Sequence, residues 1–148
     1  MNTTRPISLL LCALGGEGGG VLSQWLVEAA RIAGYPAQST SIPGVAQRTG
    51  ATTYYVEVFP QPLTDLGGRR PVMSLNPVPG ALDALVSSEL LETTRQIGLG
   101  YASPDRTRVI TSSARSFTTH ERMVLSSDGF WRSVNTAQIA DFMHTNQE

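Results

Sequence analysis

The sequence contains no lysine, so every basic side chain other than its two histidines is an arginine. This absence excludes the phosphate-binding lysine of a P-loop, the Schiff-base lysine of pyridoxal enzymes and any lysine acting as a general base. A cation that recognises a phosphate or carboxylate here must therefore be a guanidinium, which stays charged and can donate two parallel hydrogen bonds.

Cysteine is nearly absent as well, because Cys12 is the only one and lies in an apolar stretch. A single thiol excludes an internal disulfide framework and a four-thiolate iron-sulfur or zinc site. Its apolar surroundings predict a small buried hydrophobe and not a nucleophile. This cysteine usage fits a reducing compartment, and we expect a cytoplasmic protein.

Charge and long apolar runs are also scarce. Charged residues make up 16% of the chain, the net charge is -1, and the arginines are spread along the sequence, so we expect no binding to nucleic acid. The apolar run at residues 7–14 is far shorter than the roughly 20 residues of a membrane helix, and it lacks a cleavage site. No membrane segment is expected, and a length of 148 residues suits a single domain, residues 1–148.

The elements that are present alternate between strands and helices. Residues 8–14 form a continuous apolar run that ends in glycines, which predicts a central parallel strand. Apolar residues then recur at helical spacing until Gly34 and Pro36 end the helix. These are Val21, Leu22, Trp25, Leu26, Ala29, Ala30 and Ala33. Residues 36–42 predict a second strand, joined to the first by a right-handed βαβ crossover.

The remaining pattern extends this order. Residues 52–59 alternate β-branched and aromatic types and predict the clearest strand, an antiparallel candidate in a mixed sheet. An exposed turn is expected at 61–70, an extended piece at 72–75, and strands at 81–86 and 107–111. A helix that runs to about 97 is expected to be capped by Ser87 and Ser88, with Glu89 in its first turn. Further helices are expected at 118–125 and from about 135. The predicted fold is α/β: one three-layer Rossmann-like domain with a mixed, mainly parallel sheet.

The glycine turn that follows the first strand allows two interpretations. Residues 13–18 match the dinucleotide spacing G-x-G-x-x-G only with Ala13 in place of the first glycine. No acidic residue lies between Glu28 and Glu57 to hold a ribose, and Glu17 would repel a pyrophosphate. We therefore favour a sharp turn with tight helix-to-sheet packing over a dinucleotide site. Anion binding at the helix N-terminus stays open.

Two motifs in sequence order carry a resemblance to a known family. They are the glycine turn GGEG at residues 15–18 and the loop GVAQRTG at residues 44–50. Residues 14–60 resemble the gamma-type domain of 2-oxoacid:ferredoxin oxidoreductases, and most closely the beta subunit of indolepyruvate ferredoxin oxidoreductase. Residues 81–113 resemble the continuation of that domain. Ala13 replaces a usual glycine, and a further region of long members is missing, so we expect a truncated chain or fragment.

The resemblance implies a division of labour. Such enzymes use thiamine diphosphate to decarboxylate a 2-oxoacid, pass electrons through iron-sulfur clusters to ferredoxin, and transfer the acyl group to coenzyme A. With one cysteine and no acidic diphosphate-metal motif, this chain alone is expected to bind none of these cofactors. The resemblance therefore implies a non-catalytic subunit of an oligomer that packs on a catalytic subunit, close to the coenzyme A site in some members.

The candidate anion or coenzyme A contacts are Gly15, Gly16, Gly18, Gly19, Gln47 and Arg48. The guanidinium of Arg48 can donate two hydrogen bonds to a phosphate, with the Gln47 amide beside it. An equal alternative is that Arg48 pairs with a backbone carbonyl or a nearby acidic side chain of the chain itself. No catalytic or metal-binding residue is expected, since His120 and His144 have no second ligand at helical spacing.

Trp25 and Trp131 are interpreted as core or interface aromatics. Two other functions remain open from the residues. One is a free-standing nucleotide or phosphate-binding module, and the other is an architectural oligomerisation domain.

Overall fold

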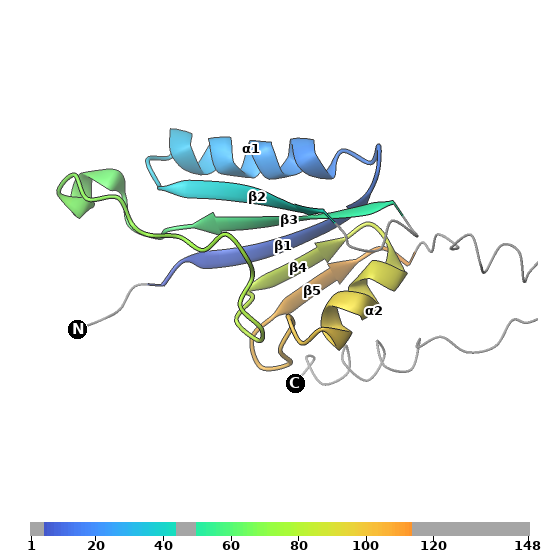
Figure 1. Ribbon diagram of the computed structural model, residues 1–148. Helices are drawn as coiled ribbons and strands as arrows, with labels where there is room; N and C mark the ends of the chain where they lie inside the picture. The colour runs from blue at the N-terminus through green and yellow to red at the C-terminus, as the bar shows by residue number, and fades with distance from the viewer. Residues whose placement is uncertain (1–4, 44–49, 114–148) are drawn as a thin grey trace, which may run out of the picture.

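The computed structural model describes residues 5–43 and 50–113, which form a five-stranded sheet in the order β2-β3-β1-β4-β5 (Figure 1). The strands are β1 (Ile7–Leu14), β2 (Ala37–Pro43), β3 (Ala51–Val58), β4 (Ala84–Ser87) and β5 (Arg108–Thr111). The helices are α1 (Gly19–Ile32), α2 (Leu90–Gly98) and the short 3-10 turn η1 (Leu63–Leu66). Within these residues no helix combines the length and the apolar character needed to cross a bilayer.

The sheet is mixed, and β3 alone runs against the other strands. β1 pairs antiparallel with β3 and parallel with β4, β3 pairs antiparallel with β2, and β4 pairs parallel with β5. The predicted α/β class and mixed sheet are confirmed, including the antiparallel strand. β1 and β2 run parallel and are joined through α1, as expected of a βαβ connection. They are not neighbours, because β3 is inserted between them and pairs with both.

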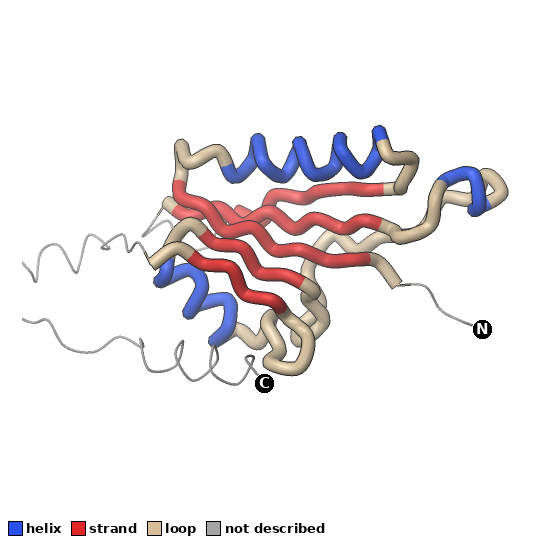
Figure 2. The backbone as a smooth tube through the Cα atoms, turned by 180° about the vertical axis from the view of Figure 1, so that it is seen from behind, coloured by secondary structure: helices blue, strands red, loops and turns tan. Residues whose placement is uncertain are grey.

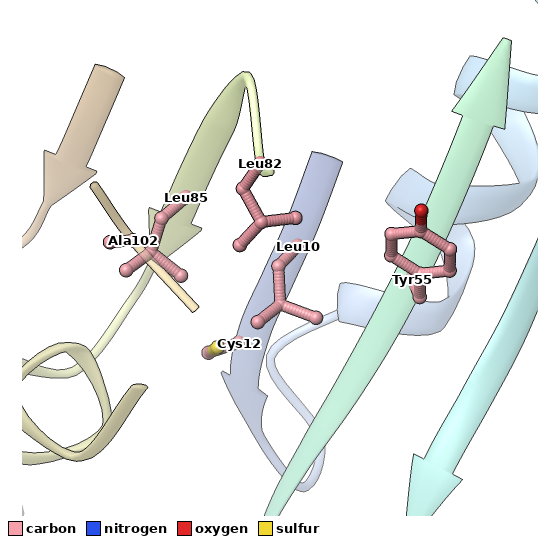
Figure 3. Close-up of a cluster of buried hydrophobic side chains, with 6 residues drawn as sticks. All are labelled: Leu10, Cys12, Tyr55, Leu82, Leu85 and Ala102. Carbon is pink, nitrogen blue, oxygen red and sulfur yellow. The ribbon is translucent and has the colours of Figure 1, made fainter. Parts of the chain in front are cut away.

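The two helices cover opposite faces of the sheet (Figures 1 and 2). Alternate residues of β1 point to opposite sides. Leu10 and Cys12 belong to one buried cluster, against which Ile97 of α2 packs. Leu11 belongs to another cluster with Val27 of α1. Figure 3 shows the first cluster, with Leu10, Cys12, Tyr55, Leu82, Leu85 and Ala102 side by side. β1 is therefore buried on both faces, as its continuous apolar run predicts.

Helix α1 approaches the sheet closely at its first residue. A Cβ atom added to Gly19 would lie 2.6 Å from the Cβ of Ala13 and 3.0 Å from a ring carbon of Tyr54. Only glycine allows the helix to rest against β1 and β3 at this distance. The packing interpretation of the glycine turn is therefore confirmed for Gly19.

The sheet-facing side of α1 includes only part of the predicted apolar stripe. Ser23 and Val27 are buried, whereas Trp25 is 69% exposed and Ile32 is 79% exposed. The close approach at Gly19 fixes the rotation of the helix, and the small Ser23 fits beneath it because its hydroxyl donates to the carbonyl oxygen of Gly20 at 2.8 Å. Of the predicted apolar residues, Leu26 and Ala30 pack on the core cluster of Val27. Val21, Leu22 and Trp25 face outward, so Trp25 is not a core residue.

The C-terminus of α1 matches its sequence signal. Gly34 has a φ of 88° and donates its N–H to Arg31 O at 2.9 Å, while the Tyr35 N–H reaches Ala30 O at 2.9 Å. This is a Schellman motif, which favours glycine at the position of Gly34.

The chain segment after η1 covers the α2 side of β2 and β3. The amide of Gln38 donates to Ser74 O at 2.7 Å, and the hydroxyl of Thr40 donates to Leu75 O at 2.6 Å. The buried carboxylate of Glu57 accepts the N–H of Ser74 at 2.7 Å and the hydroxyl of Tyr55 at 2.5 Å. The extended piece predicted at residues 72–75 is therefore not a strand, because side chains and not a backbone ladder attach it to the sheet.

The start of α2 also differs from expectation. Glu89, and not Ser87 or Ser88, is the N-cap residue, and its carboxylate accepts the N–H of Glu92 at 2.8 Å. The hydroxyl of Ser87 donates to Glu89 O instead. The strands predicted at 81–86 and 107–111 correspond to β4 and β5, whereas the helices predicted at 118–125 and from 135 lie outside the described residues.

Candidate functional site

The glycine turn lies at the topological switch point of the sheet. β1 and β4 are parallel neighbours, and the chain leaves them toward α1 on one face and α2 on the other (Figure 1). In open α/β sheets, ligands bind outside the carboxyl ends of the strands at such a point. The turn at residues 15–18 and the β4–α2 loop at Ser88 therefore border the most favourable position for a ligand.

The backbone conformation explains two of the glycines in the turn. Gly16 has a φ of +88° and Gly18 a φ of +81°, both in the left-handed region that L side chains rarely adopt. A Cβ atom at either position would meet nothing within 4 Å. Both glycines therefore shape a turn whose outer side is open.

The two motifs that carry the family resemblance meet at this turn. The N–H of Gly15 donates to Gly50 O at 3.0 Å, and the next residues, Leu14 and Ala51, are paired in the β1–β3 ladder. Gly50, with a φ of +70°, is the last residue of the GVAQRTG loop. The end of that loop is thus fixed beside the glycine turn. Gln47 and Arg48 lie outside the described residues.

Glu17 connects the two loops at the switch point. One of its carboxylate oxygens accepts the N–H of Leu14 at 3.0 Å and the hydroxyl of Ser88. The hydrogen bond from Ser88, and then that from Leu14, lowers the pKa of Glu17 below its ordinary value of 4.5. Sequence reasoning found Glu17 only as a charge that would repel a phosphate. In the structure these neutral donors keep the carboxylate ionised and hold it within the turn, so that it connects the two loops.

The N-terminus of α1 is not neutralised by its own residues. Gly18 is the N-cap, no side chain caps the helix, and no acidic residue lies in its first turn. The first N–H groups of a helix have no partner within it and carry partial positive charge, which favours an anion. Of the predicted contacts, Gly15, Gly16 and Gly18 form the turn, and Gly19 begins the helix while packing on Ala13.

A buried polar cluster lies below α2, next to the end of β1. Glu92 is 2% exposed and forms an ion pair with Arg95 at 3.3 Å, and the hydroxyls of Thr93 and Thr111 are 2.6 Å apart. Burial, and then the charge of Glu92, raises the pKa of Cys12 to about 12, with Arg95 opposing. Cys12 is therefore a protonated, buried thiol, as predicted. The burial of Thr93 was not predicted because its partner, Thr111, lies on β5.

No group of three or more His, Cys, Asp or Glu side chains that could hold a metal ion occurs in residues 5–43 and 50–113. The arrangement offers an anion site built from backbone N–H groups.

Comparison with known proteins decides the family. The model of the family described as pyruvate ferredoxin/flavodoxin oxidoreductase matches residues 8–143. The chain belongs to this family. A comparison with curated proteins finds no match.

Solved structures were compared with the chain, and one of them shares its fold with a TM-score above 0.5. The 2-oxoglutarate:ferredoxin oxidoreductase from Magnetococcus marinus, solved with 2-oxoglutarate, coenzyme A and succinyl-CoA bound, matches with a TM-score of 0.56 and 11% identity over 76% of this chain and 17% of that one. The pyruvate oxidoreductase subunit PORC from Thermotoga maritima matches with a TM-score of 0.49 and 20% identity, covering 85% of this chain and 58% of that one.

A gamma subunit of a keto/oxoacid ferredoxin oxidoreductase from Geobacter sulfurreducens PCA matches with a TM-score of 0.46 and 16% identity, over 71% of this chain and 60% of that one. The chain spans less than two thirds of the length of each of these structures.

Proposed function

We propose that the chain is a gamma-type subunit of a 2-oxoacid:ferredoxin oxidoreductase, inactive alone, that packs on a catalytic subunit. The family match over residues 8–143 supports this most directly. The meeting of the glycine turn with the end of the GVAQRTG loop, through Gly15 and Gly50, supports the same assignment at the level of the site.

The chemistry of the side chains supports the assignment of the redox groups to a partner. Cys12 is the only thiol in the sequence, lies within β1 and is 2% exposed. A four-thiolate iron-sulfur cluster cannot be built from it. In the proposed complex the catalytic subunit therefore carries the thiamine diphosphate and the clusters, and ferredoxin receives electrons from that subunit.

We propose that the glycine turn borders the coenzyme A site of the complex. The backbone fits a phosphate of coenzyme A, because the turn is open at Gly16 and Gly18 and no side chain caps the N-terminus of α1. The carboxylate of Glu17 stays ionised, but its hydrogen bonds hold it against Leu14 N and Ser88. Gly16, Gly18 and Gly19 would offer backbone N–H groups, with Gln47 and Arg48 as the side-chain contacts. The N–H of Gly15 already donates to Gly50 O, so Gly15 would border the phosphate without donating to it. Coenzyme A supplies the thiol that accepts the acyl group.

The proposed substrate is indolepyruvate, on the resemblance of residues 14–60 alone. The catalytic subunit would contact the oxoacid, so this chain would influence the choice of oxoacid only through assembly. Rates of the complex with indolepyruvate, pyruvate and 2-oxoglutarate measure this part of the proposal, and a preference for either of the other two acids would contradict it.

The first experiment is to express the tagged chain together with its neighbouring genes. We expect a brown partner with iron-sulfur absorbance to copurify with the chain in a fixed ratio. A colourless chain recovered alone, or an isolated chain that retains a chromophore, would contradict the proposal.

Arg48 has a matched control in Arg69, an exposed arginine next to η1. In the complex, Arg48→Ala should raise the KM for coenzyme A with little change in the melting temperature of the isolated chain. Arg69→Ala should leave both unchanged. A large drop in melting temperature for Arg48→Ala would favour a structural pairing instead.

A second function is favoured by the open N-terminus of α1, which suits a free-standing phosphate-binding module. Calorimetry of the isolated chain against coenzyme A, FMN and NAD separates the two. Micromolar binding by the chain alone would support the module. The subunit proposal predicts no such binding without the partner.

A further inference from the structure

Helix α1 exposes an apolar stripe that the chain's own core does not use. Its members are Val21, Leu22, Trp25 and Ile32, which are 48%, 42%, 69% and 79% exposed. Val21 and Leu22 precede Trp25 by four and three residues, and Ile32 follows it by nearly two turns. This spacing places all four side chains along one side of the helix. Figures 1 and 2 show α1 as an outer layer, with no other described element over its outer face.

This stripe is too apolar for an ordinary solvated helix face. The sheet is already covered by the opposite side of α1, where Ser23 and Val27 are buried. A tryptophan side chain buries roughly 150–250 Å² when it is covered, and contiguous exposed patches of this kind mark interaction surfaces. Trp25 and Ile32 therefore require an occupant from outside the described fold.

Charged residues beside the stripe indicate which occupant fits. Glu28 and Arg31 are both exposed and border a groove of about 450 Å³ between α1 and the edge strand β2. Arg31 donates to Ala37 O at 3.3 Å, and neither residue has an ion pair within the described residues. The stripe thus has one negative and one positive side chain, a single helical turn apart, along the same edge.

We propose that α1 pairs with α1 of a second copy of this chain, antiparallel and around a two-fold axis. In a two-fold interface, if residue i contacts residue j of the other copy, then j contacts i. Trp25 then packs near Ile32 of the second copy. Glu28 of each copy faces Arg31 of the other, so the interface contains two such pairs. The charges are self-complementary in this antiparallel arrangement, because the two-fold axis places the edge that carries Glu28 and Arg31 beside the same edge of the second copy with its direction reversed. In a parallel two-fold pair these edges lie on opposite sides of the interface, so the charges do not meet.

This inference goes beyond the proposed function and does not depend on it. A dimer formed through α1 leaves the glycine turn and the α2 side of the sheet free for the catalytic subunit. Self-association concerns the isolated chain, whereas the subunit assignment is measured by copurification, so the two fail independently.

Sedimentation velocity of the full chain from roughly 1 µM to roughly 500 µM tests the proposal, because one helix pair is smaller than a standard interface and should dissociate on dilution. We expect a monomer at the low end and a dimer at the high end. Trp25→Gln should weaken the dimer roughly tenfold or more. Val72→Gln, at a side chain that is 96% exposed elsewhere, is the control and should leave the dimer unchanged.

A charge exchange identifies the occupant as a second copy. Glu28→Arg and Arg31→Glu should each weaken the dimer, and the double variant should restore it, because each pair is re-formed with reversed signs. Melting temperatures verify that the variants fold. A chain that stays monomeric throughout, equal effects of Trp25→Gln and Val72→Gln, or a double variant as weak as the single ones would overturn the proposal. So would protection of α1 from hydrogen exchange only when the catalytic subunit is added.

Discussion

Replacement of Gly19 by alanine tests how α1 rests on the sheet. The added methyl group would lie 2.6 Å from Ala13 Cβ and 3.0 and 3.4 Å from two ring carbons of Tyr54. Both neighbours belong to strands in the middle of the sheet, β1 and β3. Relief of this contact therefore requires movement of the helix or of the tyrosine ring.

The expected cost follows from two opposing effects. Overpacking in a close-packed region costs about 1–3 kcal/mol. Alanine is favoured over glycine by up to about 1 kcal/mol in a helix interior, and by less in the first turn. The net destabilisation should be about 1–2 kcal/mol, which lowers the melting temperature by roughly 2–8 °C for a chain of this size.

Urea unfolding followed by far-UV circular dichroism measures this cost. Gly98→Ala is the matched control, because its added Cβ would meet nothing within 4 Å and it also lies in a helix. We expect that variant to be at least as stable as the parent. Ala13→Gly removes the nearest atom, so the double variant Ala13→Gly with Gly19→Ala should show a favourable coupling of about 1 kcal/mol.

Two outcomes would refute the packing of Gly19. One is a Gly19→Ala variant as stable as Gly98→Ala. The other is a double variant whose destabilisation is the simple sum of the two single changes. Either result would mean that α1 does not rest on Ala13.

Three further predictions concern single groups. The pKa of Glu17 in the folded chain lies below 4.5, so its contribution to stability is present above pH 4.5 and is lost as the pH falls through the lowered pKa. In urea unfolding, Glu17→Gln should therefore be less stable than the parent at pH 7. This difference should vanish in acid. Cys12, with a pKa of about 12, should react with a thiol reagent at pH 8 no faster than the chain unfolds, and rapid labelling of the native chain would contradict its burial. Glu89→Ala removes the cap of α2 and should cost about 0.5–2 kcal/mol in urea unfolding, whereas Glu89→Gln retains an acceptor oxygen and should cost less; equal losses would argue against the cap.

Local patterns predicted most of the strands. The apolar run at 8–14 corresponds to Ile7–Leu14, and the alternation at 52–59 corresponds to Ala51–Val58. Pairing partners were harder to predict, because the insertion of β3 between β1 and β2 depends on contacts between distant segments. Residues 72–75 have the composition of an extended strand, but they are attached by Gln38, Thr40 and Glu57.

The orientation of α1 shows why helical periodicity was insufficient. The helix has an apolar stripe through Leu22, Trp25 and Ile32, and one of smaller side chains through Leu26, Val27 and Ala30 on its other side. The larger stripe is the natural choice for the sheet. The approach of Gly19 to Ala13 selects the smaller one, and that contact has no signal in the spacing of apolar residues.

The site was predictable only in its local part. A glycine turn before a helix indicated an anion-binding geometry, and Gly16 and Gly18 have the positive φ angles of such a turn. The bridge from Glu17 to Ser88 joins residues 71 positions apart, and the bond from Gly15 to Gly50 joins separate motifs. Neither contact could be derived from spacing.

Turnover of the proposed complex tests the subunit assignment most directly. Ferredoxin reduction that depends on a 2-oxoacid and coenzyme A is measured with the purified catalytic partner, with this chain, and with both. We expect each component alone to be inactive and the mixture to be active. Full turnover by the partner without this chain, or oxidation of a 2-oxoacid by this chain alone, would contradict the assignment.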